Sequence, residues 1–185
     1  MELVRIFDGK DTFWCVSYPE DDGADILDVL FSQWSDNEYL INFFTENIKD
    51  LQSKEWQGIS VDKAVDLVLD EVNFLEDKLI CIEYEEQPEC IGDVKVEHIF
   101  RPFKKHQYVI NNNAEDHFVK GRINSVPNML RLYGVQLDDG AIIISGGAIK
   151  ITSGLNRKHL KKEHEKLHNL FNYLLEHDIT NIKDL

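Results

Sequence analysis

The segment from residue 129 to residue 151 constrains the fold more than any other part of the sequence. Met129–Leu137 is largely apolar, Asp138-Asp139-Gly140 follows it, and Ala141–Ser145 is a second apolar run. Two such runs joined by an Asp-Gly dipeptide favour an antiparallel hairpin. Gly146 and Gly147 then interrupt the second strand, which indicates a bulge, a bend or close approach of another backbone.

The N-terminal part predicts a hairpin followed by helices. Leu3–Phe7 and Thr12–Tyr18 are β-rich runs around an Asp-Gly turn. Asp25 suits an N-cap, because apolar residues recur after it at helical spacing. Ser35-Asp36-Asn37-Glu38 resembles a capping box that restarts the helix. One bent helix or two short helices would satisfy this pattern.

A third helical stretch begins after Ser60. Its apolar residues recur in alternating steps of four and three; they are Val61, Val65, Val68, Val72, Leu75 and Leu79. This stripe predicts packing within the domain core, and the same spacing also fits a short coiled-coil seam. Glu83–Gly92 follows as an acidic loop.

The second half predicts strands and one closing helix. Val96–Phe100 and His106–Ile110 are expected strands, and Asn111-Asn112-Asn113 is an expected turn. A last helix is expected from about Asn156 to His177, with an apolar face of Leu160, Leu167, Leu170, Phe171 and Leu174. The order predicts an α+β fold, in which the N-terminal hairpin and helices pack on a small antiparallel sheet that the C-terminal helix closes.

Charge divides the chain into two parts. A single domain over residues 1–185 suits the length. Residues 1–94 hold 24 acidic and 6 basic side chains, whereas residues 95–166 hold 7 acidic and 13 basic ones. We therefore expect an acidic hairpin and helical part over 1–93 and a basic sheet and helix part over 94–185. The acidic flank could repel RNA, shape the field around a basic cleft, or keep the protein soluble.

Cysteine usage and hydropathy indicate a cytoplasmic protein. Cys15, Cys81 and Cys90 form no C-x-x-C pair, and their odd number predicts reduced thiols rather than a disulfide framework. The first residues show no basic segment followed by an apolar run, and no apolar run reaches eighteen residues. We expect neither secretion nor contact with a membrane.

The order of elements and one local motif resemble the RelE/HigB-like, ParE-related superfamily of bacterial toxins. Leu130-Arg131-Leu132-Tyr133-Gly134-Val135, the Asp-Gly turn and Ile142–Thr152 look like the family's Arg-bearing strand, turn, apolar strand and terminal Lys-x-Thr. The resemblance covers residues 94–175, and residues 1–90 agree in element order. It implies a metal-independent, cofactor-free mRNA endonuclease acting at the ribosome. An antitoxin and mRNA on the ribosome are the implied partners, and a homodimer is compatible.

Cleavage of RNA by this route places demands that name candidate residues. A ribose 2′-OH attacks the adjacent phosphate, so a base, cationic donors for the phosphorane and an acid for the leaving oxygen are needed. Arg131 matches the family's strand arginine, and strand alternation puts Tyr133 on the same face. Arg131 is the expected transition-state stabiliser, or it pairs with a carboxylate of the acidic half. Tyr133 is a candidate for base stacking or proton transfer.

Further cations are candidates for RNA binding. The resemblance assigns Lys150 to the RNA backbone, and Lys120 and Arg122 flank Gly121 at the same rim. Four more cations begin the closing helix, where they bind RNA or form an ordinary solvated face; they are Arg157, Lys158, Lys161 and Lys162.

One expected catalytic group is missing from its usual place. Many HigB-like members carry a histidine where this chain has Gly146. His106 or His117 could replace that histidine, or the fold could bind without catalysis.

His164-Glu165-Lys166-Leu167-His168 fits H-E-x-x-H, a zinc motif when it lies on a helix. His164 falls within the apolar stripe of the closing helix and His168 at its edge, so a packed pair of histidines is the expected alternative. Three functions thus remain open: a toxin ribonuclease, an inactive protein-binding module whose apolar helix stripe meets a partner, and a zinc-dependent hydrolase.

Overall fold

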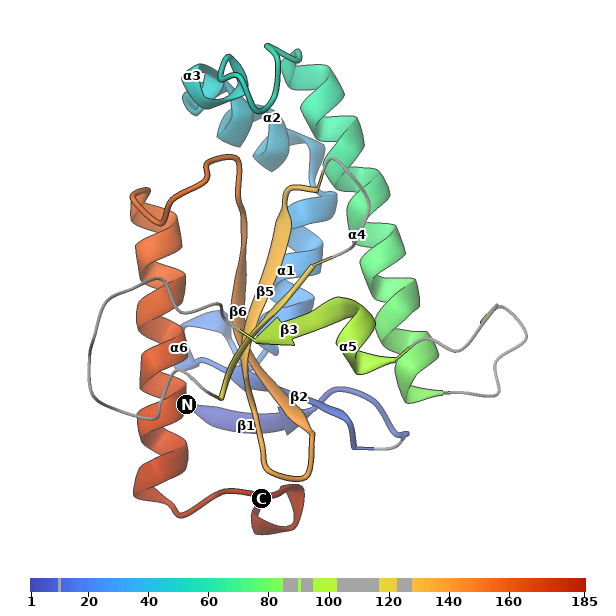
Figure 1. The fold of residues 1–185 in the computed structure, drawn as a ribbon, viewed down its shortest axis with the longest axis vertical. Coiled ribbons are helices and arrows are strands. Elements are labelled where there is room, and N and C mark those ends of the chain that lie inside the picture. Colours follow the sequence, from blue (N-terminus) through green and yellow to red (C-terminus); the bar gives the residue numbers. More distant parts are fainter. Residues whose placement is uncertain (10, 85–89, 91–94, 103–116, 123–127) are drawn as a thin grey trace.

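A computed structural model of the protein describes residues 1–9, 11–84, 90, 95–102, 117–122 and 128–185 (Figure 1). Its centre is a six-stranded sheet in the order β1-β2-β6-β5-β4-β3. The strands are β1 Glu2–Arg5, β2 Phe13–Ser17, β3 Phe100–Pro102, β4 Phe118–Gly121, β5 Leu130–Gln136 and β6 Ile142–Ile149. The helices are α1 Ile26–Ser35, α2 Asn37–Glu46, α3 Ile48–Leu51, α4 Val61–Glu83, α5 Val96–Ile99 and α6 Lys158–Glu176, with short 3₁₀ turns at Pro19–Asp21 and Ile182–Asp184.

The sheet is mixed, so the α+β class is confirmed while the expectation of an antiparallel sheet is wrong at one pair. β2 runs parallel to β6, with Phe13 beside Ile142 and Cys15 beside Ile144. Every other pair is antiparallel. Apolar alternation specifies which face of a strand is buried, but it does not specify the direction of the neighbouring strand. This pairing joins the acidic and basic parts of the chain in one sheet.

Two hydrophobic clusters lie on the two faces of the sheet. The first gathers α1, α2 and α4 around residues such as Trp34, Phe44 and Leu132. The second packs α6 against Tyr133, Val135 and Ile143 of the other face. Figure 1 shows α4 and α6 on opposite sides of the strands. The expected closing role of the C-terminal helix is therefore confirmed.

The expected helix starts are largely confirmed. Asp25 caps α1 by accepting from the backbone N–H groups of Leu27 and Asp28, and Ser60 caps α4 through Lys63. Two short helices form where the sequence allowed either one or two. Their junction is capped by Asp36 rather than by Ser35, because Ser35 is the last residue of α1. The apolar stripe of α4 is buried in the first cluster from Val65 to Leu79.

Other expectations are wrong or fall outside the described residues. Val96–Phe100 is not a strand, because α5 fills most of it and β3 begins at Phe100. The acidic loop begins later than expected, since α4 continues to Glu83. His106–Ile110, Asn111-Asn112-Asn113 and most of the loop lie outside the described residues.

The thiol prediction is also wrong for two cysteines. Cys81 and Cys90 form a disulfide, and Cys15 is a buried free thiol. The sequence did not reveal this pair because its two cysteines are nine residues apart and form no C-x-x-C motif. Among the helices that the structure describes, none has both the length and the apolar character needed to cross a membrane.

Candidate functional site

Strand register gathers four cations on one face of the sheet. Arg131 lies opposite Ala148, and Lys120 lies opposite Tyr133. Gly121 pairs with Leu132, so Arg122 follows beside Arg131. Lys150 lies opposite Met129, to whose carbonyl oxygen its backbone N–H donates over 2.6 Å. We call Lys120, Arg122, Arg131 and Lys150 the sheet-face cations; all four are half-buried.

The sheet-face cations interact electrostatically. Burial lowers the pKa of Lys150, and the positive charges of Arg131 and Arg122 lower it further, while Glu55 opposes the shift. Burial likewise lowers the pKa of Arg131; Glu71 opposes this most strongly, and Arg122 adds to it. Positive charges that are partly removed from water and close together favour an anion between them. The strand register therefore brings four cations together on one face of the sheet.

Glu71 lies beside the sheet-face cations, but its carboxylate already accepts hydrogen bonds from backbone N–H groups. Its two carboxylate oxygens accept from the N–H groups of Met129, over 2.6 Å, and Leu130, over 3.0 Å. Burial raises its pKa to about 7 despite these bonds. Glu71 is thus a neighbour of Arg131 whose main contacts fix the start of β5. Arg131 itself donates to the carbonyl oxygen of Leu130.

Tyr133 shares the face with Arg131 but is not accessible. It is 4% exposed within the second hydrophobic cluster. Burial raises its pKa to about 12, so its hydroxyl keeps its proton at neutral pH. The expected roles of Tyr133 in base stacking and proton transfer do not fit this environment, because α6 covers the ring. Strand alternation correctly predicted the face of the sheet on which Tyr133 lies. It could not predict that α6 covers the ring.

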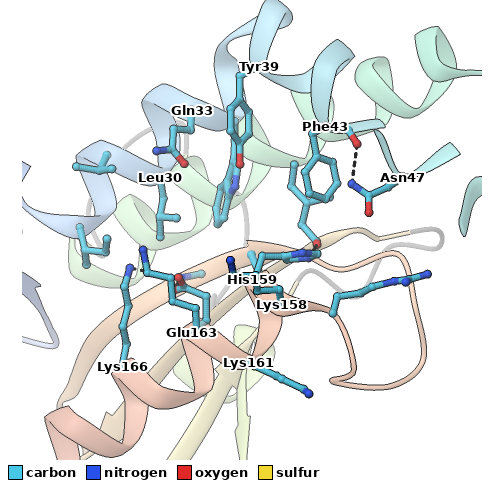
Figure 2. Close-up of a pocket in the computed structure, with 18 of the residues that line it drawn as sticks. Leu30, Gln33, Tyr39, Phe43, Asn47, Lys158, His159, Lys161, Glu163 and Lys166 are labelled. Atoms are coloured by element: carbon cyan, nitrogen blue, oxygen red, sulfur yellow. Dashed lines mark hydrogen bonds and ion pairs between the residues drawn. The ribbon is translucent and has the colours of Figure 1, made fainter. Parts of the chain in front are cut away.

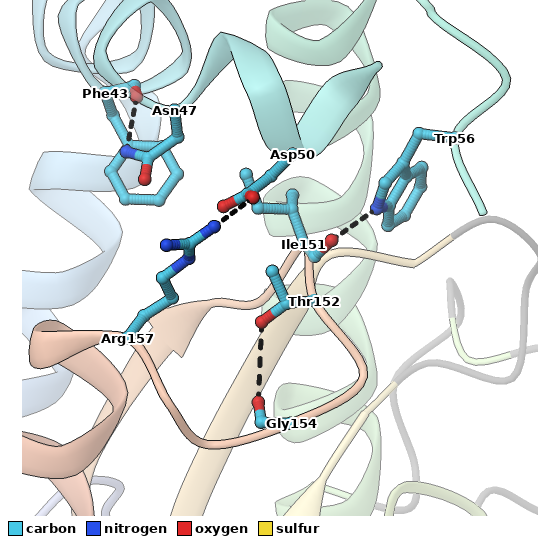
Figure 3. Close-up of polar contacts among 8 residues, drawn as sticks. All are labelled: Phe43, Asn47, Asp50, Trp56, Ile151, Thr152, Gly154 and Arg157. Carbon is cyan, nitrogen blue, oxygen red and sulfur yellow. Dashed lines mark hydrogen bonds and ion pairs between the residues drawn. The ribbon is translucent and has the colours of Figure 1, made fainter. Parts of the chain in front are cut away.

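The basic start of α6 is only partly free for a ligand. Arg157 turns to α3 and forms an ion pair with Asp50, as Figure 3 shows. In the same region the indole N–H of Trp56 donates to the carbonyl oxygen of Ile151 over 2.8 Å. Lys158, Lys161 and Lys162 are exposed. Arg157 is therefore directed at α3 rather than at the sheet-face cations.

An interhelical groove of about 1000 Å³ separates α6 from α1 and α2 (Figure 2). Residues 147–149 of β6 also line it. Glu163 is 8% exposed and accepts from the backbone N–H of Gly147 over 3.0 Å. Lys166 approaches the other oxygen of Glu163 at 3.2 Å. Burial raises the pKa of Glu163, and Lys166 opposes the shift.

Glu163 also lies close to Gly146, the position at which the resemblance to RelE/HigB-like toxins led us to expect a histidine. A Cβ on Gly146 would come within 2.0 Å of the Oε2 of Glu163. No side chain can therefore occupy residue 146 while Glu163 keeps its place. The sequence could not reveal this contact, because residues 146 and 163 lie on different elements.

The histidine pair of the zinc motif packs toward β4. The rings of His164 and His168 lie 4.7 Å apart, and the ring of His168 meets Phe118 edge-on at 4.9 Å. In the part of the chain that the structure describes, no three His, Cys, Asp or Glu side chains gather to hold a metal ion. His164 and His168 are both half-buried rather than deep in the core.

His164 lies on α6 between two residues that contact the sheet. Glu163 accepts from the backbone N–H of Gly147 in β6, and the ring of His168 meets Phe118 of β4. The helix that carries all three residues packs on the face of the sheet that holds Tyr133.

Of the two other histidines considered, the structure describes His117 alone. His117 contacts the carbonyl oxygen of Gln136 and the ring of Phe171, and His106 lies outside the described residues.

Comparison with known proteins gives no family. No family model, no curated protein and no solved structure matches the chain. The site has to be interpreted from its own chemistry.

Proposed function

We propose that the protein is a RelE/HigB-like toxin that cleaves mRNA at the ribosome in the cytoplasm, without a cofactor, and that an antitoxin neutralises it. The observation that carries this proposal is the gathering of Lys120, Arg122, Arg131 and Lys150 on one sheet face by the strand register; burial lowers the pKa of Arg131 and of Lys150 there, and the charge of Arg122 lowers both further. A phosphodiester supplies the negative charge that these side chains lack. The arginine fork suits the phosphorane, because it stays charged and donates two parallel hydrogen bonds.

The proposed reaction assigns one role to each group. The ribose 2′-oxygen bonds to phosphorus, the bond from phosphorus to the 5′-oxygen breaks, and the proton lost by the 2′-OH is balanced by one delivered to the 5′-oxygen. Arg131 stabilises the phosphorane, and Lys150 and Arg122 hold the flanking phosphate groups. His164 replaces the family histidine as the proton-transfer group, since it borders the same face from α6.

A second candidate function is RNA binding without cleavage. The observation that favours it is the loss of two acid–base groups: Tyr133 is buried with a pKa of about 12, and residue 146 has no room for a side chain. The other inactive alternative is a module that binds a protein partner through the apolar stripe of α4. It lacks support, because that stripe is buried in the core.

Expression in a bacterial host tests the proposal. We expect the wild-type chain to arrest growth and to generate new mRNA ends that primer extension detects. Arg131→Ala should abolish both effects, and Lys49→Ala, which removes an exposed cation of α3, should abolish neither. Binding of RNA that persists with no cleavage by the wild type would favour the second candidate. Harmless expression together with no RNA binding would refute both.

His164→Ala separates catalysis from binding. We expect a fall of at least about 100-fold in cleavage rate with little change in RNA affinity. His168→Ala is the matched control, because it removes the neighbouring imidazole that packs on Phe118. Equal rates for the His164 variant and the wild type would remove His164 from the mechanism.

A further inference from the structure

The interhelical groove has two chemically different walls. The wall from α1 and α2 presents the aromatic rings of Tyr39 and Phe43 and the neutral amide of Gln33. The wall from α6 presents Lys158 and Lys162. Figure 2 shows Tyr39 and Phe43 pointing from α2 toward α6 across the groove. A ligand that suits both walls needs a flat apolar part and an anionic part.

Three rings form one continuous surface along the groove. Tyr39 and Phe43 are nearly parallel, with centroids 6.4 Å apart and an interplanar angle of 21°. Phe43 meets the ring of His159 edge-on at 5.4 Å. His159 is fixed by its contact with the carbonyl oxygen of Ile149 at 3.1 Å. Tyr39 is 37% exposed, so its ring can accept a stacking partner without a rearrangement of the core.

A buried carboxylate lies among these groups. Glu163 lines the groove, and its charge acts on Tyr39, whose pKa is raised first by burial and then by Glu163. Lys162 acts on Glu163 from the α6 side. Each oxygen of Glu163 keeps acceptor capacity beyond its bond to Gly147 or Lys166. A buried carboxylate repels acidic peptides and other simple anions, so the ligand has to bring N–H donors as well as negative charge.

We propose that this groove binds a guanine ribonucleotide unit, with the base against Tyr39 and Phe43 and the phosphate on Lys158 and Lys162. Guanine offers adjacent N–H donors on one edge, which match the two oxygens of a carboxylate. Adenine has a single donor group, its exocyclic amine, which is flanked by the acceptors N1 and N7, so it matches less well. The volume of about 1000 Å³ accommodates a complete nucleotide.

The site differs from the sheet-face cations and goes beyond the proposed function. It opens on the side of α1 and α2, whereas His168 on the other flank of α6 contacts β4. The unit can come from a free nucleotide or from a base within RNA. Only the RNA source rests on the proposed function.

Calorimetric titration of the full chain with GMP, IMP and AMP tests the proposal. We expect saturable binding of one GMP, with AMP at least about tenfold weaker. IMP should be intermediate, because it lacks one of the two donors. Absence of saturable binding at millimolar GMP would overturn the proposal, as would equal affinity for GMP and AMP.

Variants assign the contacts within the groove. Glu163→Gln keeps an acceptor for Gly147 and should weaken GMP about tenfold while leaving AMP almost unchanged. Lys162→Ala should weaken both nucleotides about fivefold, and Lys49→Ala should weaken neither. If the Glu163 variant does not fold, Tyr39→Ala at an exposed position provides the alternative test of the groove. Unchanged affinity in the folded variants would overturn the proposal.

Two further measurements separate this site from the proposed nuclease and identify the source of the nucleotide. Arg131→Ala should abolish RNA cleavage and leave GMP affinity within about twofold, so the two proposals can fail independently. If the unit comes from RNA, a short guanine-containing RNA should displace GMP and bind more tightly than GMP. If the unit is free, the RNA should not compete.

Discussion

Glu71 links the acidic half of the chain to the start of β5 at the scale of a single residue. A carboxylate with two backbone donors would ordinarily have a low pKa, yet burial raises the pKa of Glu71 to about 7. The folded state therefore keeps a proton that the unfolded state releases near pH 4.5. Between these two values unfolding releases a proton, so the Glu71 contribution to stability falls as the pH rises.

Glu71→Gln should remove this pH dependence. We expect the free energy of unfolding of the wild type to lose on the order of 2–3 kcal/mol from Glu71 as the pH rises from about 4.5 to about 7. Urea denaturation at several pH values measures the slope, and the variant should give a flatter curve in this window. A slope that is identical in the two proteins would show that Glu71 titrates normally.

Gly147 is a residue whose lack of a side chain is required by packing. A Cβ there would lie 2.7 Å from the carbonyl oxygen of Arg131 and 2.8 Å from the ring of Trp34. Gly147→Ala should destabilise the fold by about 1–3 kcal/mol through overpacking. Gly154→Ala is the matched control, since its nearest neighbour would be 3.5 Å away. Thermal or chemical denaturation measures both, and equal stability of the two variants would contradict the packing around Gly147.

At the scale of elements, the sequence predicts best where local chemistry decides the structure. The Asp-Gly hairpin of β5 and β6 and the caps Asp25 and Ser60 follow from turn and capping rules. The same rules give the side of β5 that carries Arg131 and Tyr133. Turn and capping rules cannot predict that α6 covers Tyr133 or that Glu163 lies close to Gly146. Both contacts depend on elements that meet only in the folded chain. The glycine pair had suggested a bulge, a bend or close approach of another backbone; a bulge occurs, and the backbone oxygen of Arg131 lies close to Gly147. The register shifts opposite Ser145, and Glu163 approaches Gly146.

The end of α4 carries the one disulfide in the part of the chain that the structure describes. Reduction should lower the stability of the wild type by about 2–3 kcal/mol, because a cross-link across nine residues restricts the unfolded chain. Denaturation with and without a thiol reductant measures this, and the variant that combines Cys81→Ser and Cys90→Ser should not respond. If the protein purified without reductant exposes three free thiols on unfolding, the disulfide is absent. In a reducing cytoplasm the functional form would be the one in which Cys81 and Cys90 are free thiols.

At the scale of the whole molecule, a net charge of −14 has to be reconciled with the proposed RNA binding. The negative charge is concentrated in residues 1–94, whereas the sheet-face cations lie in β4 and β5 or directly after β4 and β6. Because salt screens charges more than about 8–10 Å apart at physiological ionic strength, the distant acidic surface should slow association more than it weakens the bound state. The positions of the sheet-face cations, rather than the net charge, then determine whether a phosphate binds.

The salt dependence of RNA affinity tests this view directly. Each phosphate neutralised on a single strand contributes about 0.7 to the slope of log affinity against log salt. The double variant Arg131→Ala with Lys150→Ala should lower the slope by about 1.4, whereas Lys49→Ala with Lys63→Ala should leave it unchanged. All four cations carry the same formal charge, so a general electrostatic attraction would change both slopes equally. Only a phosphate seated on the sheet face makes the two slopes differ, because counterions are released where contact occurs rather than where charge is present.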